Sequence, residues 1–456
     1  MRRHTTARMP TATPFVRALA RAVRRARARS MASSSSSSSR ASSASSSRAA
    51  SDTATTRGRV AVVGGGASGA ACAREIARRS TREVCVFDAG RALGGRASTR
   101  EEARGRWDHG AAFAAASDGD GDDDDDDERA WRSWIEEKTR CGEMVRWCGP
   151  FATVRASDGD ARVVEASDAR FAWSPSFDDV ERRALERAGV DVRTSARVVG
   201  FARDDANGTV SVRYEAFGEG ERTESGFECV VLADKNVATR RGERGDAVLD
   251  SLDVDDIASA MRGVSSTPSL SLMVTLNRAP AVDFVGAEIV ADDTLGWMAN
   301  ESSKPGRETR DVCWVAHATE AYATSKVTEQ SLKTRPGTPE HAAWMHDVER
   351  DMRDALLRVL RAVESPSASS DQPLEIVSAR AHRWGAAFPT SSATTDGAKF
   401  LRASRPGVAV YAVGDYCGGD APDARRRGLR AAVLSGLAAA ADVCAAAADG
   451  RIQSKL

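Results

Sequence analysis

The chain has 456 residues, with 65 basic and 65 acidic side chains and a pI near 7.0. This balance leaves no basic surplus for nucleic-acid binding. No apolar run is expected to reach the ~18 residues that span a bilayer, and the Ala-rich C-terminal segment is too weakly hydrophobic to do so. The eight cysteines include no C-x-x-C pair, which argues against a zinc site or a disulfide framework. Buried thiols are predicted at Cys72, Cys85, Cys229 and Cys444.

Residues 1–57 are predicted to be a targeting or disordered segment. Met1–Ser51 is rich in arginine and serine and has no acidic residue, the composition of an organellar transit peptide. Phe15–Arg29 can form a basic amphipathic helix, as in mitochondrial signals, whereas the sequence from Met31 onward is more typical of a plastid signal. An unstructured segment of biased composition is the alternative. The remaining residues, about 400, have the size of a two-domain enzyme.

The next stretch predicts a dinucleotide-binding unit. Gly64, Gly66 and Gly69 form G-x-G-x-x-G, which permits a tight turn, close approach of a pyrophosphate, and close packing of helix on strand. A Gly-rich loop without a ligand is the alternative for this motif alone. Its context is a strand, a helix and a second strand, expected at Arg59–Val63, about Ala67–Arg79 and Val84–Phe87.

The predicted helix and second strand add ligand contacts. The helix N-terminus, with Ala67 and Ser68, directs its free N–H groups and its positive end at the phosphates. Asp88 ends the second strand near the ~20-residue offset of an acid that hydrogen-bonds a ribose 2′-hydroxyl. Its charge would repel a 2′-phosphate, which argues against NADP.

A Gly-Gly-Arg motif then favours FAD over NAD. Gly94, Gly95 and Arg96 follow Asp88 closely; the glycines bring backbone near a ligand, and the arginine suits phosphate or flavin oxygens. With this motif the chain resembles the flavin amine-oxidase superfamily, and within it the renalase-like FAD oxidoreductases. The resemblance implies that a further segment runs along the flavin, with contacts from Asp108, His109 and Gly110.

The C-terminal part resembles the same family. Gly407–Val413 is an apolar strand, followed by Gly414 and Asp415 and, after a polar loop, by a predicted helix at Gly428–Ala441. The resemblance implies that the Gly-Asp contacts ribityl or phosphate oxygens of a non-covalent FAD. The helix would aim its positive N-terminus at the flavin pyrimidine edge, where a reduced flavin gathers negative charge. A strand–loop–helix with an Asp cap is the alternative.

Three internal segments extend the resemblance. A strand at Ala196–Phe201, preceded by a helix at Phe177–Ala188, is similar to the family segment whose backbone meets the adenine, here at Val198. The strand Cys229–Ala233 continues into Asp234-Lys235-Asn236, where the family has an apolar, Pro-containing turn. Near the C-terminal part, a segment resembles the H-R-W signature of renalase-like proteins and supplies candidates for the substrate pocket: His382, Arg383 and Trp384. A core Trp beside an exposed Arg is the alternative there.

The predicted fold is therefore α/β, a discontinuous Rossmann-type FAD-binding domain interleaved with an α+β substrate domain on a mixed sheet. The FAD-binding domain is assigned to 58–116, 176–240 and 400–450, and the substrate domain to 129–175 and 241–399. Residues 117–128 form an acidic loop and 451–456 a C-terminal tail. The substrate domain is expected to contain strands at Ser269–Leu276 and Asp311–Ala316 and an amphipathic helix at Pro339–Val363.

These features predict an FAD-dependent oxidoreductase. The favoured reaction is an oxidase that takes hydride from an amine or a dihydronicotinamide-type donor and passes electrons to O2, giving H2O2. The alternatives are a flavin dehydrogenase or monooxygenase with another acceptor or donor, and a non-catalytic flavin-binding protein. No catalytic side chain and no metal site is predicted, although Lys235 and Lys399 are candidates for the flavin-facing lysine of amine oxidases.

The last three residues, Ser454, Lys455 and Leu456, form the peroxisomal import signal. They predict the peroxisomal import receptor as a partner. A peroxisomal location is favoured slightly over a plastid or mitochondrial one, and dual targeting stays open.

Overall fold

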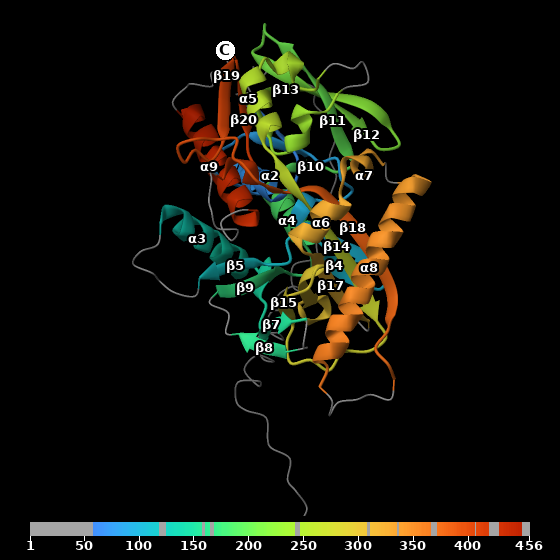
Figure 1. The fold of residues 1–456 in the computed structure, drawn as a ribbon. Helices are drawn as coiled ribbons and strands as arrows, with labels where there is room; N and C mark the ends of the chain where they lie inside the picture. Colours follow the sequence, from blue (N-terminus) through green and yellow to red (C-terminus); the bar gives the residue numbers. More distant parts are fainter. Residues whose placement is uncertain are drawn as a thin grey trace, which may run out of the picture. The chain divides into compact units, whose positions relative to one another are not determined.

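Figure 1 shows the fold in a computed structural model. The structure describes residues 58–117, 125–156, 160–164, 168–241, 247–307, 311–334, 337–365, 372–405, 407–418 and 428–448. The predicted targeting segment, most of the acidic loop and the C-terminal tripeptide lie outside the described residues.

The first sheet carries the predicted dinucleotide motif. Its order is β10-β2-β1-β13-β12-β11, and β20 pairs with both β13 and β19. β1, β2, β10, β13 and β20 run parallel where they pair, which is the arrangement of a sheet covered on both faces. The strands are β1 Arg59–Val63, β2 Glu83–Phe87, β10 Asp191–Arg193, β11 Ala196–Asp204, β12 Thr209–Ala216, β13 Gly220–Leu232, β19 Leu401–Arg405 and β20 Val408–Ala412.

Alternate residues of these strands enter two separate core clusters. Val60 and Val62 of β1 pack toward α2 (Ala67–Arg79) and α9 (Leu429–Ala448), which lie against each other. Ala61 and Val63 point to the opposite face, into a cluster that contains α5 (Asp255–Gly263). This alternation explains why β1 is apolar at every position but its first, because neither of its faces meets solvent.

The second sheet has seven strands in the order β18-β14-β17-β16-β15-β7-β8. It is mixed, as predicted, because β15 and β7 are parallel while the other pairs are antiparallel. Helix α8 (Pro339–Val363), which has the predicted ends, packs its apolar stripe on this sheet and runs beside β18 in Figure 1. The strands are β7 Phe151–Arg155, β8 Asp160–Val164, β14 Ser266–Leu276, β15 Gly286–Val290, β16 Leu295–Asn300, β17 Val312–Ala318 and β18 Ile376–Pro389.

Smaller elements connect the two sheets. One group is the hairpin of β3 (Thr99–Glu102) and β4 (Gly105–Asp108). Another is the sheet β5-β9-β6, at Ala114–Ser117, Asp168–Trp173 and Met144–Arg146. The remaining helices are α3 Asp126–Arg140, α4 Phe177–Arg187, α6 Glu320–Lys326 and α7 Glu329–Lys333, with short 3-10 turns η1 Gly95–Ala97, η2 Lys235–Ala238, η3 Asp250–Leu252, η4 Glu301–Ser303 and η6 Asp415–Cys417.

The packing differs from the predicted domain boundaries at two places. η3 and α5 were assigned to the substrate domain, yet Leu252, Ile257 and Met261 pack in the core cluster on the first sheet. Helix α3 likewise buries Trp131 and Ile135 in the cluster that holds α2 and α9. In both cases the apolar side chains of a helix pack against the core of the first sheet. The order of segments along the chain does not reveal which sheet such a helix covers.

The last residues of the acidic segment 117–128 are helical and do not belong to a loop. Helix α3 begins at Asp126, and the carboxylate of Asp125 accepts a hydrogen bond from the N–H of Glu128 at 2.7 Å. Acidic side chains in a first helical turn complement the positive end of the helix, so this part of the run starts the helix.

Helix α9 is more apolar than the sequence analysis allowed. Leu429–Ala446 has a mean hydropathy of 1.5 and is, among the described residues, the one helix long and apolar enough to cross a membrane by length and composition. The expectation that no segment reaches this threshold was wrong. Of this window, 61% is buried in the protein. A Cβ at Gly436 would lie 2.2 Å from the carbonyl oxygen of Ser68, so α9 packs on α2 as a core helix does.

All eight cysteines are free thiols. Cys72, Cys85 and Cys229 are buried as predicted, while Cys444 on α9 is only partly buried.

Candidate functional site

A cavity of about 990 Å³ lies against the carboxyl end of β1 and extends to the second sheet. This volume is at the upper end of the range of about 300–1,000 Å³ for small-molecule and cofactor sites. The cavity is lined by the Gly-rich turn, the Gly-Gly-Arg motif, the segment His109–Phe113, the turn after β13, the end of β18, and the Gly-Asp motif with the start of α9.

The Gly-rich turn has the predicted geometry. Gly64 adopts a φ of +107°, and a Cβ at Gly69 would lie 1.9 Å from the Gly64 carbonyl oxygen, so helix and strand are in close contact. At Gly66, in contrast, the nearest atom to a Cβ would be 3.7 Å away, which leaves its cavity side open to a ligand. Ala67 and Ser68 line the cavity at the N-terminus of α2, where no described side chain caps the helix. The first N–H groups of α2 are therefore free to bind an anion.

Asp88 lines the cavity at the end of β2 and also orders the turn. Its two carboxylate oxygens accept hydrogen bonds from the N–H groups of Gly65 and Gly90, both at 2.6 Å. Burial raises the pKa of Asp88, and these two hydrogen bonds act in the opposite direction. Each carboxylate oxygen still has acceptor capacity for a hydroxyl group.

Arg96 and Asp415 join the Gly-Gly-Arg motif near the start of the described chain to the Gly-Asp motif near its end. Their side chains form a bidentate pair, with Nη1–Oδ2 at 2.6 Å and Nη2–Oδ1 at 2.7 Å, and Nη1 also donates to the Ala387 carbonyl at 2.6 Å. Burial alone would lower the pKa of Arg96, but the charge and hydrogen bonds of Asp415, together with the nearby Tyr416 and Asp234, raise that pKa. Both residues line the cavity, with Gly95 and Gly414 beside them. The arginine therefore holds the Gly-Asp motif in place, a role that the sequence analysis did not foresee.

The segment after β4 lies in the cavity wall, but Asp108 does not. His109 and Gly110 line the cavity, whereas the Asp108 side chain is buried on the other side in a cluster of charged residues. Asp108 therefore does not line the cavity in which its contact with the cofactor was predicted. Its carboxylate is 1% exposed and accepts hydrogen bonds from Lys304, Arg307 and the Thr99 hydroxyl.

His109 is an uncharged group in this wall. Its ring lies 5.1 Å from that of Trp384 and 4.7 Å from that of His382, and its Nδ1 is buried without a hydrogen-bond partner among the described residues. Burial, followed by the neighbouring His382, lowers the pKa of His109 to about 3. The imidazole is consequently neutral over the physiological range.

Only one residue of the H-R-W segment lines the cavity. Trp384 does so and donates from Nε1 to the His109 carbonyl at 2.9 Å. His382 packs behind His109 and does not reach the cavity. Arg383 points to the other face of β18, where its guanidinium lies 5.3 Å from the Trp344 ring. The prediction thus fails for Arg383, because successive side chains of a strand alternate between its faces. His382 lies on the same face as Trp384, with ring centroids 4.3 Å apart, but does not line the cavity.

The turn after β13 departs from the family pattern but still lines the cavity. Asp234 accepts a hydrogen bond from the Asn236 N–H and pairs with Arg240, which in turn donates to the Val198 carbonyl at 3.2 Å. Val198 lines the cavity as predicted. Lys235 does so too, with Nζ bonded to the Val264 carbonyl and the Ser266 hydroxyl; burial lowers its pKa.

Lys399, the other lysine candidate, does not line the cavity. Its Nζ pairs with Asp127 near the start of α3.

The part of the cavity against the second sheet was missed by the sequence analysis. Glu288, Trp297 and His317 are direct cross-strand partners on β15, β16 and β17, so their side chains form one row on the cavity side. Within the part of the chain that the structure describes, Trp297 Nε1 and His317 Nε2 are buried without hydrogen-bond partners, and burial lowers the pKa of His317 to about 4. Phe113 and Ser269 also line this part. These residues are single positions in separate strands, so no local motif marks them.

Two comparisons with known proteins agree with this arrangement. Residues 62–131 match the family of NAD(P)-binding Rossmann-like domains. Among solved structures, a putative protoporphyrinogen oxidase from Exiguobacterium sp. 255-15 is similar, with a TM-score of 0.54 and 11% identity over 85% of this chain and 99% of that one. Cyclohexylamine oxidase from Brevibacterium oxydans IH-35A has a TM-score of 0.54 and 12% identity over 86% and 100%. Putrescine oxidase bound to putrescine has a TM-score of 0.53 and 12% identity over 85% and 99%.

The chain has a mixed α/β fold with a Rossmann-like domain, and this fold is similar to that of these amine oxidases. At 11–12% identity the likeness concerns the fold, so substrate and chemistry have to be argued from the site. The narrower resemblance to renalase-like proteins stays a prediction.

Proposed function

We propose that this chain is an FAD-dependent oxidoreductase, and more narrowly an oxidase that takes hydride from an amine or a dihydronicotinamide-type donor and reduces O2 to H2O2. One observation carries the proposal. The Gly-rich turn, the Gly-Gly-Arg motif and the Gly-Asp motif line one cavity, and the Arg96–Asp415 pair joins the last two.

The residues of the cavity fit the parts of FAD. The pyrophosphate would lie at the N-terminus of α2 beside Gly66, whose cavity side is open. Asp88 would accept from the ribose, and the Val198 backbone would meet the adenine. Gly414 and the start of α9 would face the flavin end, where the positive end of a long helix stabilises negative charge. FAD, when bound, accepts hydride at N5 and in its reduced form delivers electrons to O2.

The part of the cavity against the second sheet would hold the donor. Aromatic rings of Phe113, Trp297 and Trp384 form its walls, and they bury a ligand while excluding water. His109 and His317 also line the cavity, as imidazoles that carry no charge near neutral pH. The Glu288 carboxylate and the Arg170 guanidinium also line the cavity, so the donor would lie near charged groups as well as these aromatic rings and neutral imidazoles.

A spectroscopic experiment tests the proposal. The purified protein should show a flavin absorption band, which should bleach when amines or reduced nicotinamides are added without oxygen and return with H2O2 on re-aeration. A colourless protein that takes up no FAD on reconstitution would refute the proposed cofactor. A flavin that bleaches but yields no H2O2 would instead point to a dehydrogenase.

A matched pair of variants links the flavin to the cavity. Gly66→Val places a side chain where the pyrophosphate would lie and should abolish the band. Gly263→Val is the control, because a Cβ at Gly263 would meet nothing within 4 Å and this residue lies outside the cavity.

We further propose import into peroxisomes through Ser454, Lys455 and Leu456, with the Arg- and Ser-rich N-terminal segment as a competing plastid or mitochondrial signal. A reporter carrying only the C-terminal tripeptide should enter peroxisomes, and a reporter carrying only residues 1–57 should reveal the second address. A cytosolic reporter in the first case would contradict the proposal.

A further inference from the structure

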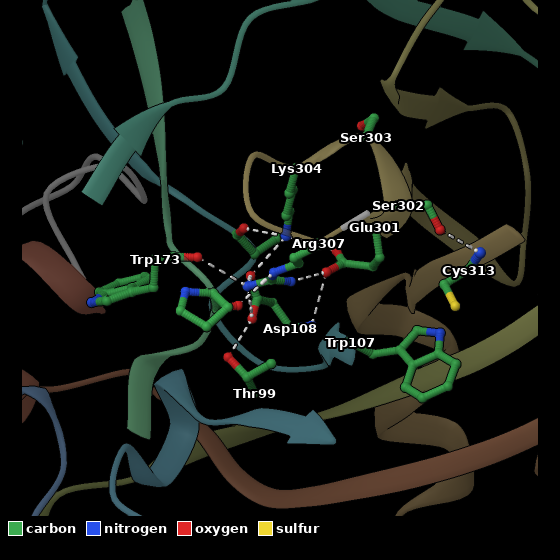
Figure 2. A network of polar contacts seen from close by, with 12 residues as sticks. Thr99, Trp107, Asp108, Trp173, Glu301, Ser302, Ser303, Lys304, Arg307 and Cys313 are labelled. Atoms are coloured by element: carbon green, nitrogen blue, oxygen red, sulfur yellow. Dashed lines mark hydrogen bonds and ion pairs between the residues drawn. The ribbon is translucent and has the colours of Figure 1, made fainter. Parts of the chain in front are cut away.

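A cluster of four buried charged residues lies behind the part of the cavity wall that His109–Phe113 forms. Asp108, Glu301, Lys304 and Arg307 are each at most 1% exposed, and they point toward one another from the end of β4 and from the loop after β16 (Figure 2). Two cations and two anions make the cluster neutral. Burial of four charges is costly, and well-packed apolar residues are often as stable, so stability alone does not explain such a cluster.

Lys304 uses all three of its N–H donors. Its Nζ lies 2.8 Å from Asp108 Oδ2, 2.7 Å from Glu301 Oε1 and 2.7 Å from the carbonyl oxygen of Ala112. The last contact reaches the backbone of the cavity wall. An ammonium group in a dry environment makes strong hydrogen bonds, so this carbonyl is held firmly.

Arg307 and Glu301 fix the other end of the wall. Arg307 Nη2 donates to both oxygens of Asp108 at 2.8 and 2.7 Å, and its Nε donates to the Pro175 carbonyl at 2.9 Å. Glu301 accepts from Arg307 Nη1 at 2.5 Å and from the backbone N–H of Asp108 at 3.0 Å. The guanidinium thereby connects the wall to the loop after β9 as well.

The residues between these two ends are the ones that line the cavity. The His109 carbonyl accepts from Trp384, and the Ala111 N–H donates to the Arg96 carbonyl at 2.9 Å. At Gly110 a Cβ would lie only 1.9 Å from that same carbonyl oxygen. The segment is therefore held from both sides, and its place in the cavity depends on where the cluster holds its ends.

We propose that Lys304 is a positioning residue of the site: by holding the Ala112 carbonyl and Asp108 together, it sets where His109 and Gly110 stand against the cofactor and the donor. The effect of Lys304 on FAD binding rests on the proposed function. Its effect on the position of His109 and Gly110 does not depend on that proposal.

The test separates charge balance from position. Lys304→Met removes the ammonium and leaves one cation with two anions. The double variant Lys304→Met/Glu301→Gln leaves one cation, Arg307, with one anion, Asp108, and so restores neutrality while the Ala112 carbonyl still lacks its donor. Lys399→Met is the control, since Lys399 pairs with Asp127 away from the cavity.

Hydrogen exchange of the backbone amides in residues 108–113 is the main readout, measured with and without added FAD. In the wild type these amides should exchange slowly. In the double variant the melting temperature should return toward the wild-type value, while these amides exchange about tenfold faster or more, as loss of one hydrogen bond to a buried carbonyl implies. Compared with the wild type, the double variant should also show a shifted absorption band of bound FAD and a lower kcat.

Two results would overturn the inference. One is rapid exchange of residues 108–113 in the wild type. The other is a double variant that regains wild-type exchange, spectrum and kcat along with its melting temperature, because the cluster would then only balance charge. If the wild type bound no FAD, the proposed function would fail, but the exchange measurement would still decide the role of Lys304 in the wall.

Discussion

Arg96 and Asp415 are 319 positions apart in the chain, and their side chains form two parallel hydrogen bonds of 2.6 and 2.7 Å. The pair fastens the loop after β20 to the Gly-Gly-Arg turn, and both partners face the same cavity. Asp415 is 2% exposed, whereas Arg96 keeps 42% of its side chain accessible. The carboxylate of the pair is therefore buried, while its guanidinium is partly exposed and accessible to a ligand.

Asp415→Asn should weaken the protein and its hold on the cofactor. It removes the acceptor charge of the pair, and hydrogen bonds to charged groups contribute about 1.5–3 kcal/mol. We expect the free energy of unfolding to fall by about that amount and FAD to dissociate more readily, as measured by denaturant titration and by flavin release. Asp253→Asn is the control, because Asp253 pairs with Arg405 but is 76% exposed. Equal effects of the two changes would contradict the role given to Asp415.

Gly110→Ala should displace the cavity wall, because the new methyl group would lie 1.9 Å from the Arg96 carbonyl oxygen. Overpacking of this kind costs about 1–3 kcal/mol. We expect a lower melting temperature together with weaker FAD binding. Gly263→Ala adds the same methyl group in open space at the end of α5 and should lower neither quantity.

Trp384→Phe should separate the hydrogen bond of Trp384 from its ring. The variant keeps an aromatic wall but loses the donor to the His109 carbonyl. A net loss of about 1 kcal/mol of stability is expected. The donor-binding step should change more than FAD binding, so KM should rise while the flavin content stays constant. Loss of flavin from the purified variant would be the contrary result.

The stability of the protein should fall as the pH is lowered below neutrality. Burial lowers the folded-state pKa of His109 to about 3 and that of His317 to about 4, below the ordinary value of about 6.5. Between these values the unfolded chain binds more protons than the folded one, so the stability contribution is complete above about pH 6.5 and is lost as the pH falls toward the folded pKa.

The slope of this loss provides the measurement. His109→Gln should remove up to about 1.4 kcal/mol per pH unit from the dependence of unfolding free energy on pH between about 6 and 4. Denaturant unfolding at several pH values would show it. Donor binding that relies on these neutral imidazoles should meanwhile be constant from about pH 6 to 8, and an unchanged slope in the variant would show that His109 is not buried in the neutral form.

The local elements were predictable because each depends on neighbouring residues. The Gly-rich turn, α2 and the strands on either side follow from a contiguous pattern, and α8 follows from apolar residues at helical spacing. The cavity position of Val198, Gly414 and Trp384 was also foreseen, through motifs of only a few residues.

What the sequence alone determined is thus the dinucleotide unit and the segments that come to line its cavity. The tertiary structure decided which residues of each segment reach the cavity: Asp108, His382 and Arg383 belong to the predicted segments but do not line it. The tertiary structure also placed Glu288, Trp297 and His317 side by side in the cavity wall, and it paired the buried side chains of Lys304 and Asp108. The physical reason is that strand register and the pairing of buried charges depend on contacts between residues far apart in the chain, and no local pattern encodes those contacts.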